Sequence, residues 1–282
     1  MLSSPPFYSK YIHLPNSNSP TPQEISSNPK YYPFFKDVIG ALDGTHVPCS
    51  PLAEECEAYC NRKGGVSQNC LVVCSFDLRF LYVLSGWEGS IVDMAMYRDA
   101  HAVDLPILEG KTYLADAGFG ACDTLLVPFQ KEWYHLQEFG HSSLWYLLSF
   151  HSSLSMTHHF CRPQNHWELY NLQHAQLWNC VEHIFGIVKW CFAILQWAPS
   201  YPMTVQVWVL PALCCLHNFI WWHDADEISS FEIPHNDRLS GHCGELQCGT
   251  ITWQESTCAS AAQDGIAQAM WDGYQTYLAA HR

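Results

Sequence analysis

The sequence predicts an α/β domain in which helices flank a mixed sheet of five strands. Short apolar runs bounded by turn residues indicate the strands, and segments with apolar residues every three or four positions indicate the helices. Their order along the chain is β-β-β-α-β-β-α-α. With 282 residues, 48% of them hydrophobic and 14% aromatic, the chain can bury a large core, which excludes disorder throughout.

Three strands come first in the predicted domain. The run 38–43 is apolar up to Asp43, and we expect it to stop at Gly44. The runs 68–76 and 80–87 are separated by only three residues, which is typical of a β-hairpin. The three strands are therefore consecutive along the chain.

A short helix and two brief strands follow. Met94, Tyr97 and His101 are spaced by three and four residues, so residues 93–104 are predicted to form an amphipathic helix. The runs 113–117 and 125–129 are apolar and flanked by Gly and Pro, as expected of buried strands. Five strands with an interposed helix indicate a mixed sheet.

Two long helices complete the domain. Residues 168–195 carry an apolar stripe at helical spacing, with Glu182 at its edge. Residues 204–221 are predicted to form a second apolar helix, which must kink at Pro211 or begin near it. The apolar stretch is interrupted by Pro, His and Asn and falls short of a membrane span, so we expect no membrane insertion.

The remaining segments differ from the domain in composition. Residues 1–33 are rich in proline and are predicted to form an extended lead-in, without the features of a secretory signal. The domain itself covers 34–223, in which 140–162 is an insertion rich in Ser and His. Residues 224–282 are predicted to form an acidic tail with a terminal helix at 261–280.

Charge and cysteine content narrow the classes of function. The formal net charge of −14 opposes non-specific attachment to nucleic acid, because phosphate binding relies on clustered Lys and Arg. The 14 cysteines are scattered among core-like runs, where a free cysteine behaves as a small apolar residue. Without a secretory signal, this distribution indicates a reducing compartment rather than a disulfide framework.

Four acidic residues stand at the ends of apolar runs, and they are Asp43, Asp93, Asp116 and Glu182. A carboxylate beside buried strands is costly to desolvate unless a cation or a donor compensates it. If these four converge, their oxygens suit Mg²⁺ or Mn²⁺, which could activate a water molecule and polarise a phosphodiester. The alternatives are helix caps and solvated loop acids, and Asp93 in particular precedes a predicted helix as an ordinary N-cap would.

A few further residues are candidates for substrate contact. Arg62 and Lys63 form one of the few basic clusters and could contact a phosphate group, although a solvated turn explains them equally well. His46 follows Asp43 closely and could donate to its carboxylate or contact substrate. A buried structural histidine is the alternative for His46.

Several segments in order resemble the sequence blocks of Harbinger-type (PIF/Harbinger) transposases and the nucleases derived from them, within the DDE superfamily. The most specific elements are DGTH, NRKG, SQN, GWEGS followed two residues later by Asp, and DAG followed by an aromatic residue. Further matching blocks are FFKDVIGALDGTHVP, NLQHAQLWNCVEHIFGIVKWCFAIL and YPMTVQVWVLPALCCLHNFI. Together the blocks cover about residues 31–222.

The resemblance implies a fold, an activity and a set of site residues. It implies a ribonuclease-H-like domain in which Asp43, Asp116 and Glu182 form the catalytic acidic set, with Asp93 as a further metal ligand. The activity it implies is DNA strand cleavage and transfer with a divalent metal, Mg²⁺ or Mn²⁺, in the nucleus. It also suggests a Myb-like DNA-binding partner protein, because the helical DNA-binding region common ahead of the catalytic domain is not recognised here.

The chain also departs from the pattern of this family. Arginines common around the last carboxylate are missing, and their places are taken by Gln173, Trp178, His183 and the pair Trp190-Cys191. Loss of these cations should weaken DNA binding. An eroded copy of a mobile element is one interpretation, which leaves three outcomes open: a retained nuclease, a catalytically inactive protein-interaction module, and a product that scarcely folds.

Overall fold

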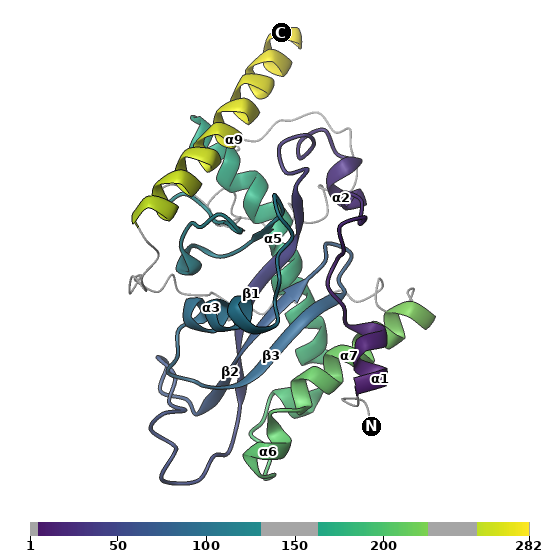
Figure 1. The fold of residues 1–282 in the computed structure, drawn as a ribbon, viewed down its shortest axis with the longest axis vertical. Coiled ribbons are helices and arrows are strands. Elements are labelled where there is room, and N and C mark those ends of the chain that lie inside the picture. Colours follow the sequence, from purple (N-terminus) through teal and green to yellow (C-terminus); the bar gives the residue numbers. More distant parts are fainter. Residues whose placement is uncertain (1–4, 131–162, 225–252, 282) are drawn as a thin grey trace, which may run out of the picture.

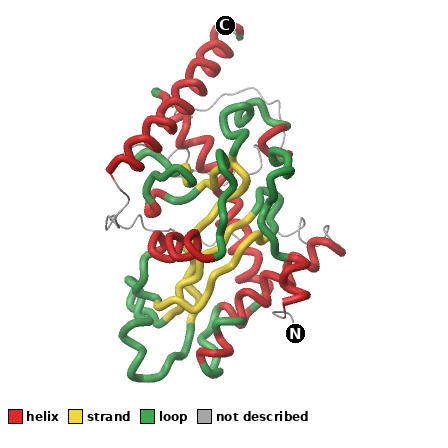
Figure 2. The backbone as a smooth tube through the Cα atoms, viewed as in Figure 1, coloured by secondary structure: helices red, strands yellow, loops and turns green. Residues whose placement is uncertain are grey.

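A mixed sheet of five strands forms the centre of the protein (Figures 1 and 2). The computed structural model describes residues 5–130, 163–224 and 253–281. The strands are ordered β3-β2-β1-β4-β5 across the sheet. Their bounds are β1 Val38–Pro48, β2 Ser67–Cys74, β3 Phe80–Glu88, β4 Thr112–Leu114 and β5 Leu125–Leu126.

The strand directions follow from the connections between strands. β1, β2 and β3 are joined by hairpin-type links and pair antiparallel. The connection from β3 to β4 passes through helix α3 (Asp93–Val103), and β4 pairs parallel with both β1 and β5. A parallel pair needs such a crossover, whereas an antiparallel pair does not. The predicted mixed sheet with flanking helices, an α/β fold of the ribonuclease-H-like kind, is confirmed.

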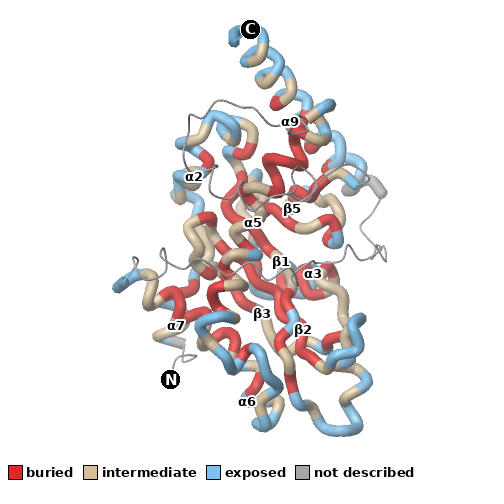
Figure 3. Tube along the Cα trace, turned by 180° about the vertical axis from the view of Figure 1, so that it is seen from behind, coloured by how far each residue is buried: buried red, intermediate tan, exposed pale blue. Residues whose placement is uncertain are grey.

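Helices cover both faces of the sheet. Helix α3 lies on one face, while α5 (His166–Cys191) and α7 (Val209–His223) lie on the other (Figure 1). We call these the α3 face and the α5 face. Because both faces are covered, every residue of β2 is buried, whereas the loop from β1 to β2 is largely exposed (Figure 3).

Alternate residues of the strands point to different cores. Cys70 and Val72 of β2 pack on the α5 face with Val181 and Ile184 of α5. Their neighbours in β2, including Leu71, pack on the α3 face in a second cluster of buried residues. This alternation shows to which face each side chain of β1 belongs, because residues paired across two strands share a face.

The lead-in contains two helices, so the expected extended conformation is wrong for part of it. They are α1 (Pro5–Tyr11) and α2 (Gln23–Ser26). Proline is tolerated here because it stands at the first position of α1 and at the N-cap of α2, where its missing N–H is not needed. Helix α1 packs on α7, with the rings of Tyr11 and Phe219 5.5 Å apart.

The predicted second long helix consists of two helices. Helix α6 (Met203–Gln206) precedes α7, and Pro211 falls within the first turn of α7, which is where proline fits without a kink. Among the described residues, only Met203–His223 is long and apolar enough to cross a membrane, judged by length and composition alone. The core helix of a folded domain passes the same test, and α7 packs on β3.

Other boundaries differ by a few residues from those predicted. Helix α5 ends at Cys191, and the next turn (Ala193–Leu195) is a 3₁₀ helix. The predicted insertion at 140–162 lies outside the described residues. The last helix, α9 (Trp253–Ala280), spans the segment 261–280 and packs along α5.

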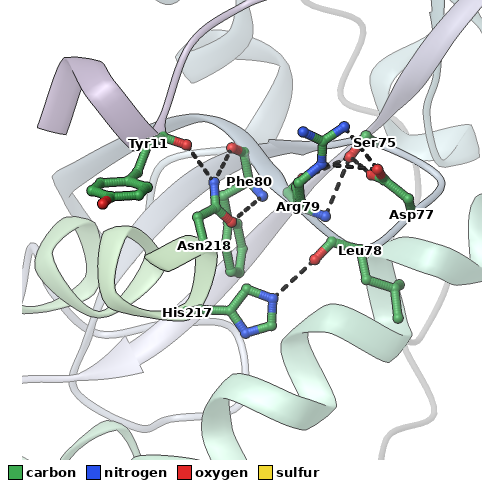
Figure 4. A network of polar contacts seen from close by, with 8 residues as sticks. All are labelled: Tyr11, Ser75, Asp77, Leu78, Arg79, Phe80, His217 and Asn218. Carbon is green, nitrogen blue, oxygen red and sulfur yellow. Dashed lines mark hydrogen bonds and ion pairs between the residues drawn. The ribbon is translucent and has the colours of Figure 1, made fainter. Parts of the chain in front are cut away.

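A polar network ties α7 to the hairpin between β2 and β3 (Figure 4). Asn218 accepts from the backbone N–H of Phe80 at 2.9 Å and donates to the carbonyl oxygens of Phe80 and Tyr11, each at 2.7 Å. The neighbouring His217 lies 2.9 Å from the carbonyl oxygen of Leu78, a residue with a positive φ of 63°. The hairpin, α7 and the last residue of α1 are therefore held by one set of hydrogen bonds.

Candidate active site

Asp43 lies in the middle of β1 with its side chain on the α5 face. Its partner across the strands is Val72, which packs on that face against α5. The backbone N–H of Gly44 donates to Oδ1 of Asp43 at 2.8 Å. The strand itself continues to Pro48, so the predicted stop at Gly44 is wrong.

Asp116 lies two residues beyond the end of β4, the parallel strand next to β1. Ala41 of β1 is in register with Leu114 of β4, and the two aspartates follow these residues by two positions each. Asp116 keeps an extended backbone (φ −66°, ψ 159°) before a 3₁₀ turn, Ala117–Phe119. Parallel strands lie roughly 4.8 Å apart, so both carboxylates project from adjacent positions on the α5 face.

Glu182 approaches the same face from α5. One turn before it, the indole N–H of Trp178 donates to the carbonyl oxygen of Leu42 at 3.3 Å, which fixes the helix against β1 beside Asp43. Much of the Glu182 residue is exposed to solvent. Its pKa is nevertheless raised, first by partial burial of its carboxyl group and then by the negative charge of Asp116. The three acids that were predicted to be catalytic thus share one face of the sheet.

The carboxylates perturb one another electrostatically. Burial is the largest cause that raises the pKa of Asp43 well above its ordinary value, followed by the negative charges of Asp93 and Asp116. Glu182 adds a smaller effect in the same direction, and the hydrogen bond from Gly44 opposes it. A site in which acids raise the pKa of their neighbour has a negative potential and attracts a cation.

Asp93 reaches β1 from the opposite side. It is the first residue of α3, so the N-cap position belongs to Val92, and the Asp93 carboxylate instead accepts from Nδ2 of Asn69 at 2.7 Å. Asn69 also donates to the carbonyl oxygen of Ile91, which holds the chain where it enters the helix. Burial raises the pKa of Asp93, while the hydrogen bond from Asn69 lowers it.

Gly44 separates Asp93 from Asp43 and is needed for space rather than for a turn. A Cβ atom at position 44 would lie 2.2 Å from Oδ1 and 2.3 Å from Cγ of Asp93. The Asp93 carboxylate therefore packs directly on the backbone of β1, with only this glycine between it and the α5 face.

We expect Gly44→Ala to lower the free energy of unfolding by about 1–3 kcal/mol, because overpacking forces the strand or α3 to shift. Denaturant unfolding measures this change. The double variant Gly44→Ala/Asp93→Ala, which removes the clashing carboxylate, should recover part of the loss. Gly265→Ala is the matched control, since a Cβ there meets nothing within 4 Å. Equal stability of Gly44→Ala and the wild type would contradict the packing described.

The basic loop ahead of β2 is anchored on the same side as Asp93. Oδ1 of Asn61 accepts from the backbone N–H groups of Lys63 and Gly65, and its Nδ2 donates to Oγ of Ser67 at 2.8 Å. Nδ1 of His46 lies 3.0 Å from the same hydroxyl oxygen. Both Lys63 and its neighbour Arg62 are exposed.

His46 is also exposed, not buried as its alternative interpretation required. The positive charge of Arg62 lowers the pKa of Asp93, so the loop contributes to the potential at the site. The charge of His46 also lowers the pKa of Asp93, so this histidine and Arg62 both act on the Asp93 carboxylate.

The donor set suits a hard divalent cation in its chemistry but does not form a closed cage. All four donors are carboxylates, the ligands that Mg²⁺ and Mn²⁺ prefer, and their mutual repulsion is what a cation would relieve. In the part of the chain that the structure describes, no three His, Cys, Asp or Glu side chains are grouped so that they could hold a metal ion.

Sequence reasoning missed three residues of this site. Asn69 holds Asp93, while Lys189 donates from α5 to the hydroxyl of Thr45 at 2.7 Å. The only signal for Lys189 in the sequence was its position seven residues after Glu182, two helical turns further along the same side of α5. Thr45 and Asn69 stand in the DGTH and SQN motifs, but their contacts become recognisable only when the register of β1 and β2 is known.

Comparison with known proteins gives a family for this arrangement. The sequence model described as "DDE superfamily endonuclease" matches residues 42–218, a range that includes all four acids. The cattle protein "Putative nuclease HARBI1" (Bos taurus) is 24% identical over 228 residues, which cover 79% of this chain and 56% of the relative.

The human protein of the same name is 25% identical over a match that covers 68% of this chain and 48% of the relative. The rat protein of the same name is 34% identical over a match that covers 33% of this chain and 26% of the relative. The matches thus span about half or less of these curated relatives. No solved structure matches.

Proposed function

Because this chain belongs to the DDE superfamily endonucleases, a family that generally uses divalent metals, we propose that it cleaves DNA phosphodiester bonds with Mg²⁺ or Mn²⁺. One observation carries the proposal. Asp43 projects from β1, Asp116 follows the end of the adjacent parallel strand β4, and Glu182 approaches the same face. The charges of Asp116 and Glu182 raise the pKa of Asp43. Oxygen donors that repel one another on the α5 face of the sheet would be stabilised by a bound cation.

The proposed roles follow from position. Asp43, Asp116 and Glu182 would hold the metal on the α5 face, and Asp93 would add a donor across Gly44. A bound divalent cation would polarise the phosphodiester and lower the pKa of a water molecule. Arg62, Lys63 and His46 would orient the DNA backbone, since phosphate contacts position a substrate without reading its sequence.

Strand transfer differs from hydrolysis only in the nucleophile, which is a terminal hydroxyl of DNA in place of water. We include it in the proposal on the strength of the resemblance to Harbinger-type transposases. Nuclear localisation rests on the same ground. The net charge of −14 supports a need for a partner, because a polyanion approaches DNA poorly, and a Myb-like DNA-binding protein would supply the missing cations.

The test is a plasmid-nicking assay with purified protein in millimolar Mn²⁺ or Mg²⁺ and in chelator. We expect nicking only with the metal, and a loss of about 100-fold or more in Asp116→Asn, which keeps the shape of the side chain and removes one anionic ligand. Asp123→Asn, an exposed acid just before β5, is the matched control and should keep wild-type activity. Cleavage that persists in chelator would overturn the proposal.

The scarcity of basic residues in α5 favours a second function. Between His166 and Cys191 this helix has Lys189 and no arginine, and the whole chain is strongly acidic. Under this alternative the protein is a catalytically inactive interaction module descended from a transposase. A cation-dependent rise in melting temperature without cleavage of any DNA would favour it over the nuclease.

A further inference from the structure

The acidic α5 face contains a positive charge of its own. Lys189 extends from α5 to β1, where its Nζ donates to Oγ1 of Thr45 at 2.7 Å. Thr45 is buried, with 6% of its surface exposed, and lies two residues after Asp43 in the same strand. Residues two apart in a strand share a face, so the ammonium group and the Asp43 carboxylate lie on the same side of β1.

The surroundings of Lys189 fix its position. Its Nζ lies 5.7 Å from the centre of the Phe185 ring, one turn earlier in α5. Thr45 is paired across the strands with Cys70, which is fully buried on the α5 face. A lysine that only covered apolar surface would direct its ammonium group to water. Here the ammonium group instead ends on a buried hydroxyl.

Charge interactions agree with this placement. Burial lowers the pKa of Lys189, and the negative charge of Asp43 opposes that change. The two groups therefore interact across the site. An ammonium group and a divalent cation that enter the same negative potential repel each other, so each weakens the binding of the other.

We propose that Lys189 is the built-in counter-ion of the Asp43 cluster: it stabilises the site without a divalent cation and lowers the affinity of the site for one. The second half of this inference rests on the proposed function, which supplies the divalent cation. A purely structural role for the Lys189–Thr45 hydrogen bond predicts something different. It predicts a loss of stability on substitution with no change in affinity for the metal.

The experiment compares Lys189→Met with the wild type by Mn²⁺ titration, read from the melting temperature and from the electron paramagnetic resonance signal of free Mn²⁺. We expect a lower melting temperature in chelator and an affinity for Mn²⁺ about tenfold higher, because one charge of repulsion is removed. Lys189→Arg keeps the charge and should keep the wild-type affinity. Lys111→Met removes a lysine that pairs with Asp37 at 3.0 Å and is the matched control.

The outcomes separate this inference from the proposed function. A wild-type response to Mn²⁺ that is unchanged or weaker in Lys189→Met overturns the inference and leaves the metal site standing. A response that appears only in Lys189→Met supports the inference and shows that the wild-type site does not bind Mn²⁺. No response in either protein overturns both. If Lys189→Met fails to fold, Lys189→Gln keeps a hydrogen-bond donor for Thr45 without the charge and takes its place.

Discussion

Replacement of Asp43 by asparagine should abolish metal-dependent DNA cleavage and at the same time stabilise the protein in chelator. The loss of cleavage should be on the order of 1,000-fold, because Asp43 is the acid that the other carboxylates surround. The gain in stability should be about 1 kcal/mol, or roughly 2–4 °C in melting temperature, because the variant has one charge fewer among acids that repel.

The raised pKa of Asp43 determines how the stability of the wild type changes with pH. The pKa of Asp43 is raised above 3.8 in the folded protein, so between that value and the folded-state pKa the native state binds a proton that the unfolded chain has released. The contribution of Asp43 to the free energy of unfolding of the wild type should therefore fall as pH rises through that window. Asp43→Asn should lack this fall.

Denaturant unfolding at several pH values between 4 and 7, in chelator, measures the effect. Asp123→Asn, whose parent side chain is exposed, should behave as the wild type does. A variant that is less stable than the wild type at pH 7 would sink the prediction. It would mean that attraction from Lys189 outweighs the repulsion of the acids.

Asn218→Ala should have the largest effect on stability, about 3 kcal/mol or more. Asn218 has 1% of its surface exposed and makes hydrogen bonds to three backbone groups, two on Phe80 and one on Tyr11. Truncation leaves all three buried without a partner, and each such group costs about 1–3 kcal/mol, partly offset where water enters. The hairpin, α7 and the N-terminal segment should loosen together.

Urea unfolding of Asn218→Ala checks this value. Asn18→Ala, at an exposed position in the N-terminal segment, is the matched control and should change stability by less than about 0.5 kcal/mol. A loss below about 1 kcal/mol in Asn218→Ala would show that the three backbone groups find other partners.

The order of elements was predictable because it depends on local pattern. Apolar runs mark the positions of β1, β2 and β3, and the apolar stripe along α5 marks the longest helix of the domain. The passage of β1 through Gly44 was not predictable, because glycine is there to admit Asp93 from another element. The helix α1 was missed for a similar reason, since its apolar side is covered by α7, an element far away in the sequence.

The candidate site likewise contains residues that the sequence identified and residues that only the structure identifies. The resemblance named the four acids, and the structure adds which face each one takes, which follows from the pairing of Asp43 with Val72 and from the position of Asp93 at the start of α3. Lys189 had no local signature, because an isolated lysine on a helix is usually a solvated residue. Its role depends on the distance to a hydroxyl on a strand more than 140 positions earlier.

The contact between α1 and α7 extends the smallest unit that can fold on its own to include the N-terminal segment. Phe7 and Tyr11 cover Phe219, and Tyr11 also receives a hydrogen bond from Asn218. A fragment that begins at residue 34 would expose an apolar surface along α7 and would tend to aggregate. The proline-rich N-terminal segment is thus an integral part of the folded domain, because it covers α7.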